Sequence, residues 1–312
     1  MRKEITLLLL GALVLMVIGV LSGCTDVAQT NSSEYSSSSI SANTSSSTKP
    51  TPTFDNPDSV EDLCPPVPDS SPLESIGLEY EKNKNNPYYM VTGIGTCTDT
   101  TVYIPAEYKG LPVKAISKKA FQFCTSFNEI VLPDSIESIG AQAFKRCSEL
   151  KKITLSDNLK TIGFEAFMFS GITSISIPDE VEGIGISAFG YCSSLTNITF
   201  TSTKIKTIPE TCFSGCGSLQ TITVPNGVAS IEKEAFYGCT ALSSITLPES
   251  LDRIDLWCFE YCTSLNEITI PKNVSDVNYC AFVGCNDIDI YCYADIDLPN
   301  FVDVTATIHY CN

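Results

Sequence analysis

Cysteine is the residue type with the widest chemical repertoire in this chain. The 312 residues include fifteen cysteines beside a single histidine, His309. Thiols can bind zinc, form disulfides or act as nucleophiles, so their spacing decides which of these they do. No paired Cys-x-x-Cys motif occurs, which argues against a zinc site. One histidine also excludes a His-rich metal site and leaves at most one partner for a Ser-His or Cys-His dyad.

Motifs for catalysis are missing as well. The sequence lacks Gly-x-Ser-x-Gly, the phosphate-binding Gly-x-x-x-x-Gly-Lys and His-Glu-x-x-His. Gly93-Ile94-Gly95 and Gly183-Ile184-Gly185 open no βαβ unit, and His309 lies three residues from the end of the chain, where a structural or solvated role is expected. The sequence therefore predicts a protein that is not an enzyme and needs no cofactor.

The charge balance limits the possible partners further. Asp and Glu number 36 against 19 Lys and Arg, a net charge of −17, which argues against nucleic-acid binding because phosphates require basic side chains. Near the C-terminus a group of carboxylates suits Ca²⁺ by type, but its spacing fits no calcium loop. We expect a solvated acidic end that keeps the last repeat from pairing with another chain. These carboxylates are Asp287, Asp289, Asp295, Asp297 and Asp303.

The N-terminus has the pattern of an export signal. Arg2 and Lys3 precede an uncharged, mostly apolar run over residues 5–21, and Leu21-Ser22-Gly23-Cys24 follows. This last motif resembles the lipobox of bacterial lipoproteins, which implies a signal peptide over 1–23 and lipid attachment at Cys24. The alternative is an uncleaved membrane anchor, although the run is shorter than the roughly 20 residues that span a bilayer. Either reading places the rest of the chain outside the cytoplasm.

A Ser/Pro-rich acidic segment follows over residues 24–71. It contains few aliphatic residues, so it cannot bury enough apolar surface to offset the entropy of ordering, and we expect it to be disordered. As a flexible tether, it would have an r.m.s. span of roughly 40 Å.

Phenylalanine then recurs with a period of about 23 residues, which is the strongest pattern in the sequence. An Ile or Val stands five residues before each of these residues, and Ala or Cys stands directly before it. A period in the twenties predicts a solenoid, in which stacking is obligatory because one repeat cannot bury its own apolar residues. The repeat phenylalanines are Phe121, Phe144, Phe167, Phe189, Phe213, Phe236, Phe259 and Phe282.

Each repeat continues as Cys-x-x-Leu-x-x-Ile-x-Leu-Pro, whose alternating end predicts a short β-strand terminated by proline. This motif, followed by an apolar residue, x-x-Ile and Ala-Phe-x-x-Cys, resembles the BspA-like leucine-rich repeats of bacterial surface proteins. The resemblance covers residues 113–293 and implies a β-rich leucine-rich repeat solenoid of about eight repeats. It also implies an N-terminal capping segment over 72–112, with a C-terminal cap over 294–312. The third repeat is one residue short with Ser170 in the Cys place, and the fourth is one residue longer with Thr201 in place of Pro.

Seven cysteines form one column, three residues after a repeat Phe. We predict thiols rather than disulfides here, because every repeat but one carries the same residue and disulfides join residues in pairs. Cys292 and Cys311 bracket the non-repeat C-terminus and are the best candidates for a disulfide. The pairing of Cys64, Cys97 and Cys280 stays open. The column comprises Cys124, Cys147, Cys192, Cys216, Cys239, Cys262 and Cys285.

The outward strand positions predict one exposed sheet face rich in small hydroxyl side chains. This face is a candidate recognition surface, although Thr also simply suits exposed strands. Its residues include Thr154, Ser176, Thr199, Thr223, Thr246 and Thr269, together with Lys152, Asn197 and Glu267. Aromatic residues near the repeat Phe form a second possible patch, or only pack between turns.

The resemblance implies adhesion, by a lipid-anchored surface protein, to a host protein, matrix, another cell or a glycan. We expect the protein to be a monomer. The alternative function is structural, in docking within the cell envelope.

Overall fold

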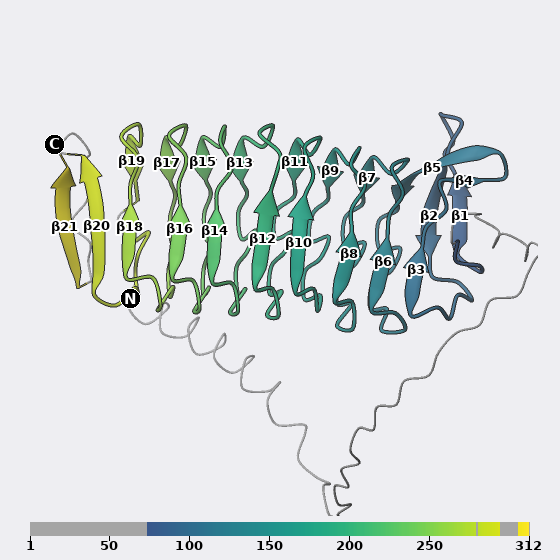
Figure 1. Cartoon of the computed structure of the whole chain (residues 1–312), viewed down its shortest axis with the longest axis horizontal. Coiled ribbons are helices and arrows are strands. Elements are labelled where there is room, and N and C mark those ends of the chain that lie inside the picture. Colours follow the sequence, from purple (N-terminus) through teal and green to yellow (C-terminus); the bar gives the residue numbers. More distant parts are fainter. Residues whose placement is uncertain (1–73, 279, 294–304, 312) are drawn as a thin grey trace, which may run out of the picture. The chain divides into compact units, whose positions relative to one another are not determined.

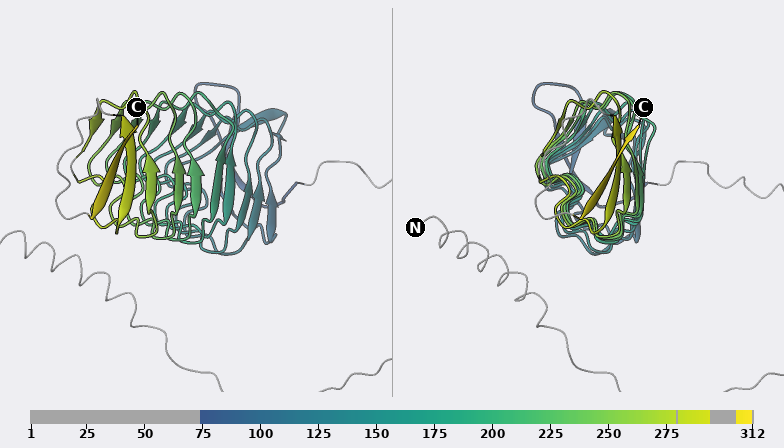
Figure 2. Two further views of the ribbon diagram at one scale, coloured as in Figure 1. Left: turned by 60° about the vertical axis from the view of Figure 1, so that its left-hand side comes forward. Right: turned by 90° about the vertical axis from the view of Figure 1, so that its left-hand side faces the viewer.

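Each repeat forms one turn of a solenoid, which we call a coil. The alternating apolar and polar residues around Ile-x-Leu-Pro form one strand of that coil. The structure is a computed structural model and describes residues 74–278, 280–293 and 305–311. These residues fall within one unit of the chain, Pro66–Asn312. Figure 1 shows two rows of short strands stacked side by side, and viewed along the stack the coils superimpose (Figure 2). We number the coils 1 to 8 by their repeat phenylalanines, from Phe121 to Phe282.

The first row contains one strand of three to six residues from each of the eight coils, with an Ile buried and the flanking side chains outward, and one further strand at each end. The register is parallel throughout, as expected for successive coils that run in one direction. The strands are β3(Thr101–Tyr103), β6(Glu129–Val131), β8(Lys152–Thr154), β10(Ser174–Ile177), β12(Asn197–Phe200), β14(Thr221–Thr223), β16(Ser244–Thr246), β18(Glu267–Thr269), β20(Ile288–Tyr293) and β21(Ala306–Cys311).

The second row consists mainly of two-residue strands, each containing the Ile or Val five residues before a repeat Phe. These strands are β5(Leu111–Ile116), β7(Ser138–Ile139), β9(Thr161–Ile162), β11(Gly183–Ile184), β13(Thr207–Ile208), β15(Ser230–Ile231), β17(Arg253–Ile254) and β19(Asp276–Val277). At its N-terminal end, β2(Tyr89–Gly93) pairs with β5, β1(Glu79–Lys82) pairs antiparallel with β2, and β4(Glu107–Tyr108) pairs antiparallel with β5.

A continuous stack of aromatic rings fills the interior. Each repeat Phe is fully buried and lies parallel to the rings of the neighbouring coils, with centroids 5.2–5.5 Å apart. Offset stacking at this spacing stabilises each pair by about 0.5–1.5 kcal/mol beyond the burial of area. The solenoid predicted from the Phe spacing is thus confirmed, and no helix occurs in the residues described.

The segment around each repeat Phe closes the coil with a specific backbone conformation. Residues two before and two after the Phe have positive φ angles in successive coils; in coil 2, φ is 59° at Gln142 and 61° at Arg146. We call the ten residues from four before to five after the Phe the turn segment. A left-handed backbone conformation costs about 1–2 kcal/mol per residue for residues other than Gly, so side chains at these positions are held at an energetic cost.

The predicted signal peptide over 1–23, the predicted lipid attachment at Cys24 and the predicted tether over 24–71 lie outside the described residues. Within the part that the structure describes, no helix is long and apolar enough to cross a membrane.

Candidate functional site

The strand face is exposed where the sequence predicted it. The register aligns Ser176 with Thr199 and Thr223 with Thr246, so hydroxyl groups follow one another along the first row. Asn197 and Lys152 lie on the same face at the preceding outward position of their strands, and Glu267 and Thr269 continue it on β18. All nine predicted residues are exposed, above a layer of buried Ile side chains. The backbone ladder holds this face rigid, which suits recognition without rearrangement.

Lys152 is already engaged by a neighbouring side chain on this face. Its Nζ lies 2.6 Å from Oε1 of Glu129 on β6. The hydrogen bond and the attraction of that carboxylate raise the pKa of Lys152. Lys152 therefore presents a pair of opposite charges rather than an unpaired cation.

The strand face is interrupted by a groove between β8 and β10. Coil 3 lacks one residue before β10, where Gly171 comes so close to coil 2 that a Cβ atom would lie 2.0 Å from the carbonyl oxygen of Ser148. Coil 4 gains one residue after β12, where Thr201 replaces the usual Pro and donates its N–H to the carbonyl of Ile177 at 3.0 Å. The first row divides into separate sheets between β8 and β10, and again between β16 and β18. Thr201 lines the opening, and the shortened segment at Gly171 precedes β10, which forms one of its sides.

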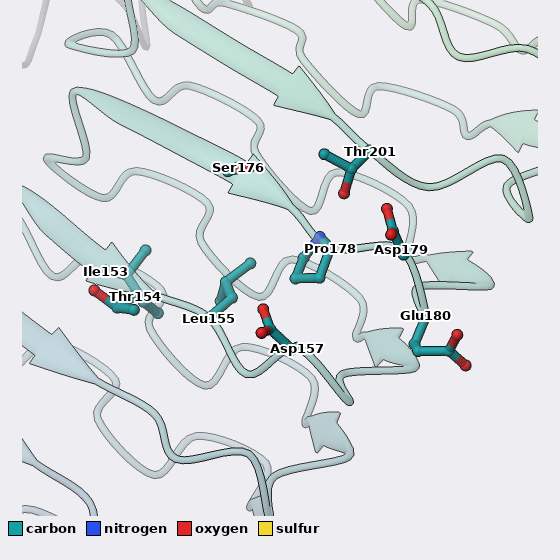
Figure 3. Close-up of a pocket in the computed structure, with 9 residues that line it drawn as sticks. All are labelled: Ile153, Thr154, Leu155, Asp157, Ser176, Pro178, Asp179, Glu180 and Thr201. Carbon is teal, nitrogen blue, oxygen red and sulfur yellow. The ribbon is translucent and has the colours of Figure 1, made fainter.

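The groove has a volume of about 660 Å³ and a mixed lining (Figure 3). Thr154, Ser176 and Thr201 contribute hydroxyl groups, and Asp157, Asp179 and Glu180 contribute carboxylates. Ile153, Leu155 and Pro178 supply apolar surface. Convergent polar groups on an apolar floor are typical of ligand sites.

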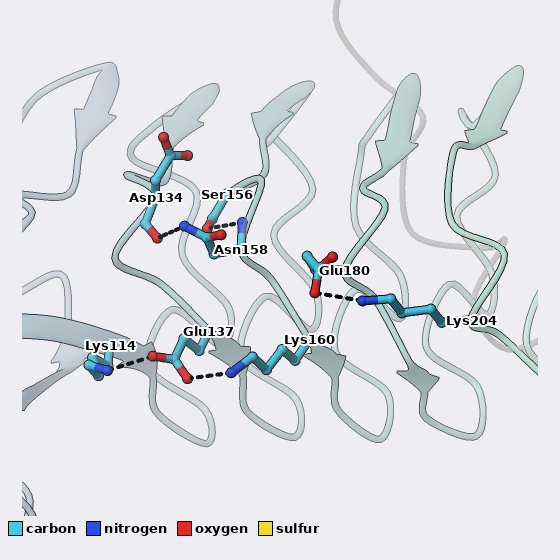
Figure 4. Close-up of polar contacts among 8 residues, drawn as sticks. All are labelled: Lys114, Asp134, Glu137, Ser156, Asn158, Lys160, Glu180 and Lys204. Carbon is cyan, nitrogen blue, oxygen red and sulfur yellow. Dashed lines mark hydrogen bonds and ion pairs between the residues drawn. The ribbon is translucent and has the colours of Figure 1, made fainter.

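Two of the groove's carboxylates are available to a ligand. Glu180 pairs with Nζ of Lys204 at 2.6 Å (Figure 4), whereas the carboxylates of Asp157 and Asp179 form no ion pair within the described residues. Free carboxylates beside hydroxyl groups can accept hydrogen bonds from sugar hydroxyls or from the ammonium and guanidinium groups of a protein.

Polar side-chain contacts also link successive coils outside the groove (Figure 4). Glu137 accepts from Lys114 at 2.6 Å and from Lys160 at 3.1 Å, and these hydrogen bonds, that from Lys114 foremost, lower the pKa of Glu137. Nδ2 of Asn158 donates to the carbonyl of Asp134 at 2.9 Å. Such exposed pairs contribute little stability singly, so their effect is to fix local geometry.

The sequence did not single out Asp157, Asp179 and Glu180. The signal that points to them is the pair of length changes in the third and fourth repeats. A residue lost before one strand and gained after the next shifts two coils against each other, and such an offset opens a surface that is otherwise regular.

Six of the seven column cysteines are buried thiols that donate hydrogen bonds between coils, whereas Cys124 in coil 1 is a half-buried free thiol. The Sγ of Cys216 lies 3.1 Å from the carbonyl oxygen of Phe189, and that of Cys239 lies 3.2 Å from the carbonyl oxygen of Phe213. The same contact recurs at Cys147, Cys192, Cys262 and Cys285. Burial raises the pKa of the Cys239 thiol to about 12, which makes it inert as a nucleophile at neutral pH.

The disulfide predicted between Cys292 and Cys311 does not form. The parallel register of β20 and β21 places Cys292 opposite Tyr310 and Cys311 opposite Tyr293. The two cysteines are therefore one position out of register and face opposite sides of the sheet, and both are free thiols.

His309 lies on the same sheet. Its Nε2 lies 2.8 Å from Oδ1 of Asp289, and its ring stacks on Tyr291. These contacts assign His309 a structural role in the terminal sheet. Of the acidic residues predicted near it, Asp295, Asp297 and Asp303 lie outside the described residues. In the described part, no three His, Cys, Asp or Glu side chains gather as metal ligands.

The coils, the internal Phe stack and the exposed strand face together define a repeat protein of the leucine-rich solenoid class. The model of the BspA type leucine-rich repeat region matches residues 114–204 and 201–297, in six copies and over more than half of the chain. The chain therefore belongs to the BspA-type leucine-rich repeat family, as its repeat motif predicted.

Solved structures of bacterial leucine-rich repeat proteins resemble this one. A leucine-rich repeat protein from Bacteroides ovatus is 26% identical over 76% of this chain and 67% of its own, with a TM-score of 0.53. The leucine-rich repeat protein of T. pallidum is 28% identical over 61% of this chain and 88% of its own, with a TM-score of 0.55. No curated protein matches the chain.

Proposed function

We propose that this protein is a lipid-anchored, cell-surface module that binds or adheres to a host protein, matrix component, neighbouring cell or glycan without catalysis. The observation that carries the proposal is the exposed strand face with its groove at Thr154, Ser176 and Asp179. Family membership supports a repeat scaffold, and function in such scaffolds resides in the surface that the repeats display.

The groove supplies the part of this face with the most specific chemistry. From β14 to β18 the strand face presents mainly hydroxyl groups, which can form many weak hydrogen bonds. In the groove, Asp157 and Asp179 add negative charge that is not neutralised by a neighbour. A ligand with several hydroxyl groups, or with a Lys or Arg side chain, satisfies both carboxylates.

The test compares the full chain with a groove variant in which Asp157→Asn and Asp179→Asn are combined. The probes are a panel of matrix proteins, a glycan array and whole animal cells, and Thr246→Ala, on the same face outside the groove, is the matched control. We expect the groove variant to lose at least tenfold in affinity for the bound probe, and the control to keep its affinity.

Two results contradict the proposal. If the protein binds none of the probes but is retained by components of its own cell envelope, the structural or docking function stands instead. If the groove variant binds as well as the control, the groove is not the recognition site.

Anchoring has its own test. Cells that express the chain are grown with labelled palmitate, and we expect label on the wild type but none on Cys24→Ala. Equal labelling of the two proteins contradicts lipid attachment at Cys24.

A further inference from the structure

The turn segments carry a second exposed surface, on a different side of the coil from the strand face. Its centre is the position two residues after each repeat Phe, which we call the outer column. The outer column holds Phe123, Arg146, Phe169 and Tyr191 in coils 1 to 4, and Gly215, Gly238, Tyr261 and Gly284 in coils 5 to 8.

The backbone of the outer column has a positive φ in every coil, from 56° at Tyr191 to 76° at Gly284. Glycine adopts this conformation without strain, whereas bulky side chains do so at a cost of about 1–2 kcal/mol. Three of the last four coils use Gly. The first four coils instead place large side chains there, all of them exposed.

Contacts along the column offset this cost but do not exceed it. The guanidinium of Arg146 lies 5.8 Å from the ring centre of Phe123 and 4.8 Å from that of Phe169. Phe169 stacks on Tyr191 at 4.9 Å. Exposed cation–π pairs contribute about 0.5–1 kcal/mol each and ring pairs about 0.5–1.5 kcal/mol, so these three contacts offset only part of the strain at four residues. Stability therefore does not account for the large side chains in these coils.

Charge is distributed along the turn segments in the same way. In coils 1 to 4 they contain four basic and two acidic residues, and in coils 5 to 8 one basic and six acidic residues. All four basic residues lie in the turn segments of coils 1 and 2, so in a chain of net charge −17 these two segments form a local basic region. Lys145 pairs with Glu165, but Lys118, Lys119 and Arg146 form no ion pair within the described residues.

Exposed apolar side chains occur in the turn segments of coils 3 and 4, the next two coils along the chain. Phe164 and Ile186 are 46% and 45% exposed and lie in the same turn segments as Phe169 and Tyr191, those of coils 3 and 4. Exposed aromatic side chains in contact with an Arg that forms no ion pair have the composition of a protein-binding surface, in which aromatic residues and Arg contribute most of the affinity.

We propose that the turn face of coils 1 to 4 is a docking surface for an acidic peptide segment with apolar or aromatic side chains. The faces of the Phe169 ring are occupied by Arg146 and Tyr191, so a sugar cannot stack on them. The edges of the Phe169 ring remain accessible and carry partial positive charge. The N–H groups of Arg146 can form two parallel hydrogen bonds with one carboxylate. Both favour a carboxylate-bearing peptide over a glycan.

The test uses the full chain and a random copolymer of Glu and Tyr as the probe. Poly-Glu, a Lys–Tyr copolymer and polygalacturonate are the comparison polymers. One variant combines Phe123→Gly, Phe169→Gly and Tyr191→Gly, and a second is Arg146→Gln. Tyr261→Gly changes the same backbone position in coil 7 and is the matched control. Affinity is measured at low and high salt, and folding is checked by thermal unfolding.

We expect the wild type to bind the Glu–Tyr copolymer more tightly than poly-Glu and to reject the Lys–Tyr copolymer. Both variants should lose at least tenfold in affinity, whereas Tyr261→Gly should lose less than twofold. Arg146→Gln changes one exposed side chain, so it keeps the test decisive if the triple variant does not fold. The Asp157→Asn/Asp179→Asn groove variant should bind the copolymer as the wild type does, which separates this surface from the strand face.

Absence of copolymer binding by the folded wild type overturns the proposal. Equal binding by Arg146→Gln and the wild type does so too. Tighter binding of polygalacturonate than of the copolymer assigns the surface to acidic polysaccharides and overturns the peptide assignment.

Discussion

Two sets of side chains follow the same 23-residue period only two residues apart, and they differ in how strictly they repeat. The inner column, made of the repeat phenylalanines, is Phe in all eight coils and is fully buried. The outer column varies from Phe and Arg to Tyr and Gly and is exposed where its side chains are large. Uniformity inside reflects a packing requirement common to all coils, because each ring contacts the next. Variation outside shows that coil closure requires the backbone conformation but not a particular side chain.

The largest predicted effect tests the burial of the interior by pH. Burial raises the pKa of Cys147, Cys192, Cys239 and Cys285 to about 12. The unfolded chain loses these protons near pH 9, so above that pH the folded state holds more protons and is destabilised as pH rises. Each thiol removes about 1.4 kcal/mol per pH unit between the two pKa values. We expect the free energy of unfolding in urea, under reducing conditions, to fall by several kcal/mol between pH 9 and pH 11.

A single substitution isolates the contribution of one thiol from that of the tyrosines, which also titrate in this range. In Cys239→Ala, the slope of the free energy of unfolding against pH should decrease by about 1.4 kcal/mol per unit. A slope identical to that of the wild type shows that the thiol is not buried as the structure has it.

The next effect in size concerns the ring stack itself. Phe213 lies 5.5 Å from Phe189 and 5.4 Å from Phe236, centre to centre, in the middle of the stack. Phe213→Ala removes both contacts and leaves a cavity, so we expect a loss of about 3–5 kcal/mol in the free energy of unfolding by urea. A loss below about 1 kcal/mol would mean that the inner column is uniform for a reason other than packing.

The sequence predicted the inner column well because periodicity alone determines which residues face inward. The spacing of Phe, Ile and Pro was sufficient to predict parallel strands in stacked coils and the exposure of Thr223 and Thr246. Residue preference gave no indication of the positive φ in the outer column, since Arg146 and Tyr191 disfavour that conformation. The conformation is imposed by closure of the coil, which is a property of the whole repeat.

The groove and the terminal sheet were missed for related reasons. The motif showed that coils 3 and 4 differ in length, but the consequence depends on how one coil sits on the next, and a sequence motif does not contain that information. Pairing of Cys292 with Cys311 likewise depends on a strand register, and a shift of one residue reverses the face of every side chain.

A smaller effect is expected in the Cys column. The Sγ of Cys216 donates to the carbonyl of Phe189 from a fully buried position. Cys216→Ala removes that hydrogen bond and a small volume, so we expect a loss of about 1–2 kcal/mol in the free energy of unfolding by urea. The counterpart is Ser170→Cys, which restores the column residue in coil 3 and should leave stability unchanged or slightly raised. If Ser170→Cys destabilises as much as Cys216→Ala, the column does not favour thiols.

The smallest effect, and the one that separates the two columns most sharply, is on Phe123 in the outer column. Phe123 is 60% exposed and has a φ of 64°, and its ring contacts Arg146 at 5.8 Å. Phe123→Gly loses that contact but relieves the backbone strain, so we expect the free energy of unfolding by urea to rise by up to about 1 kcal/mol. Removing a whole aromatic ring should therefore be neutral or stabilising here, whereas the same loss two residues away, at Phe121, is strongly destabilising. Destabilisation of more than about 1 kcal/mol by Phe123→Gly would show that the outer column serves the fold. Backbone strain at these positions would then give no support to a docking surface.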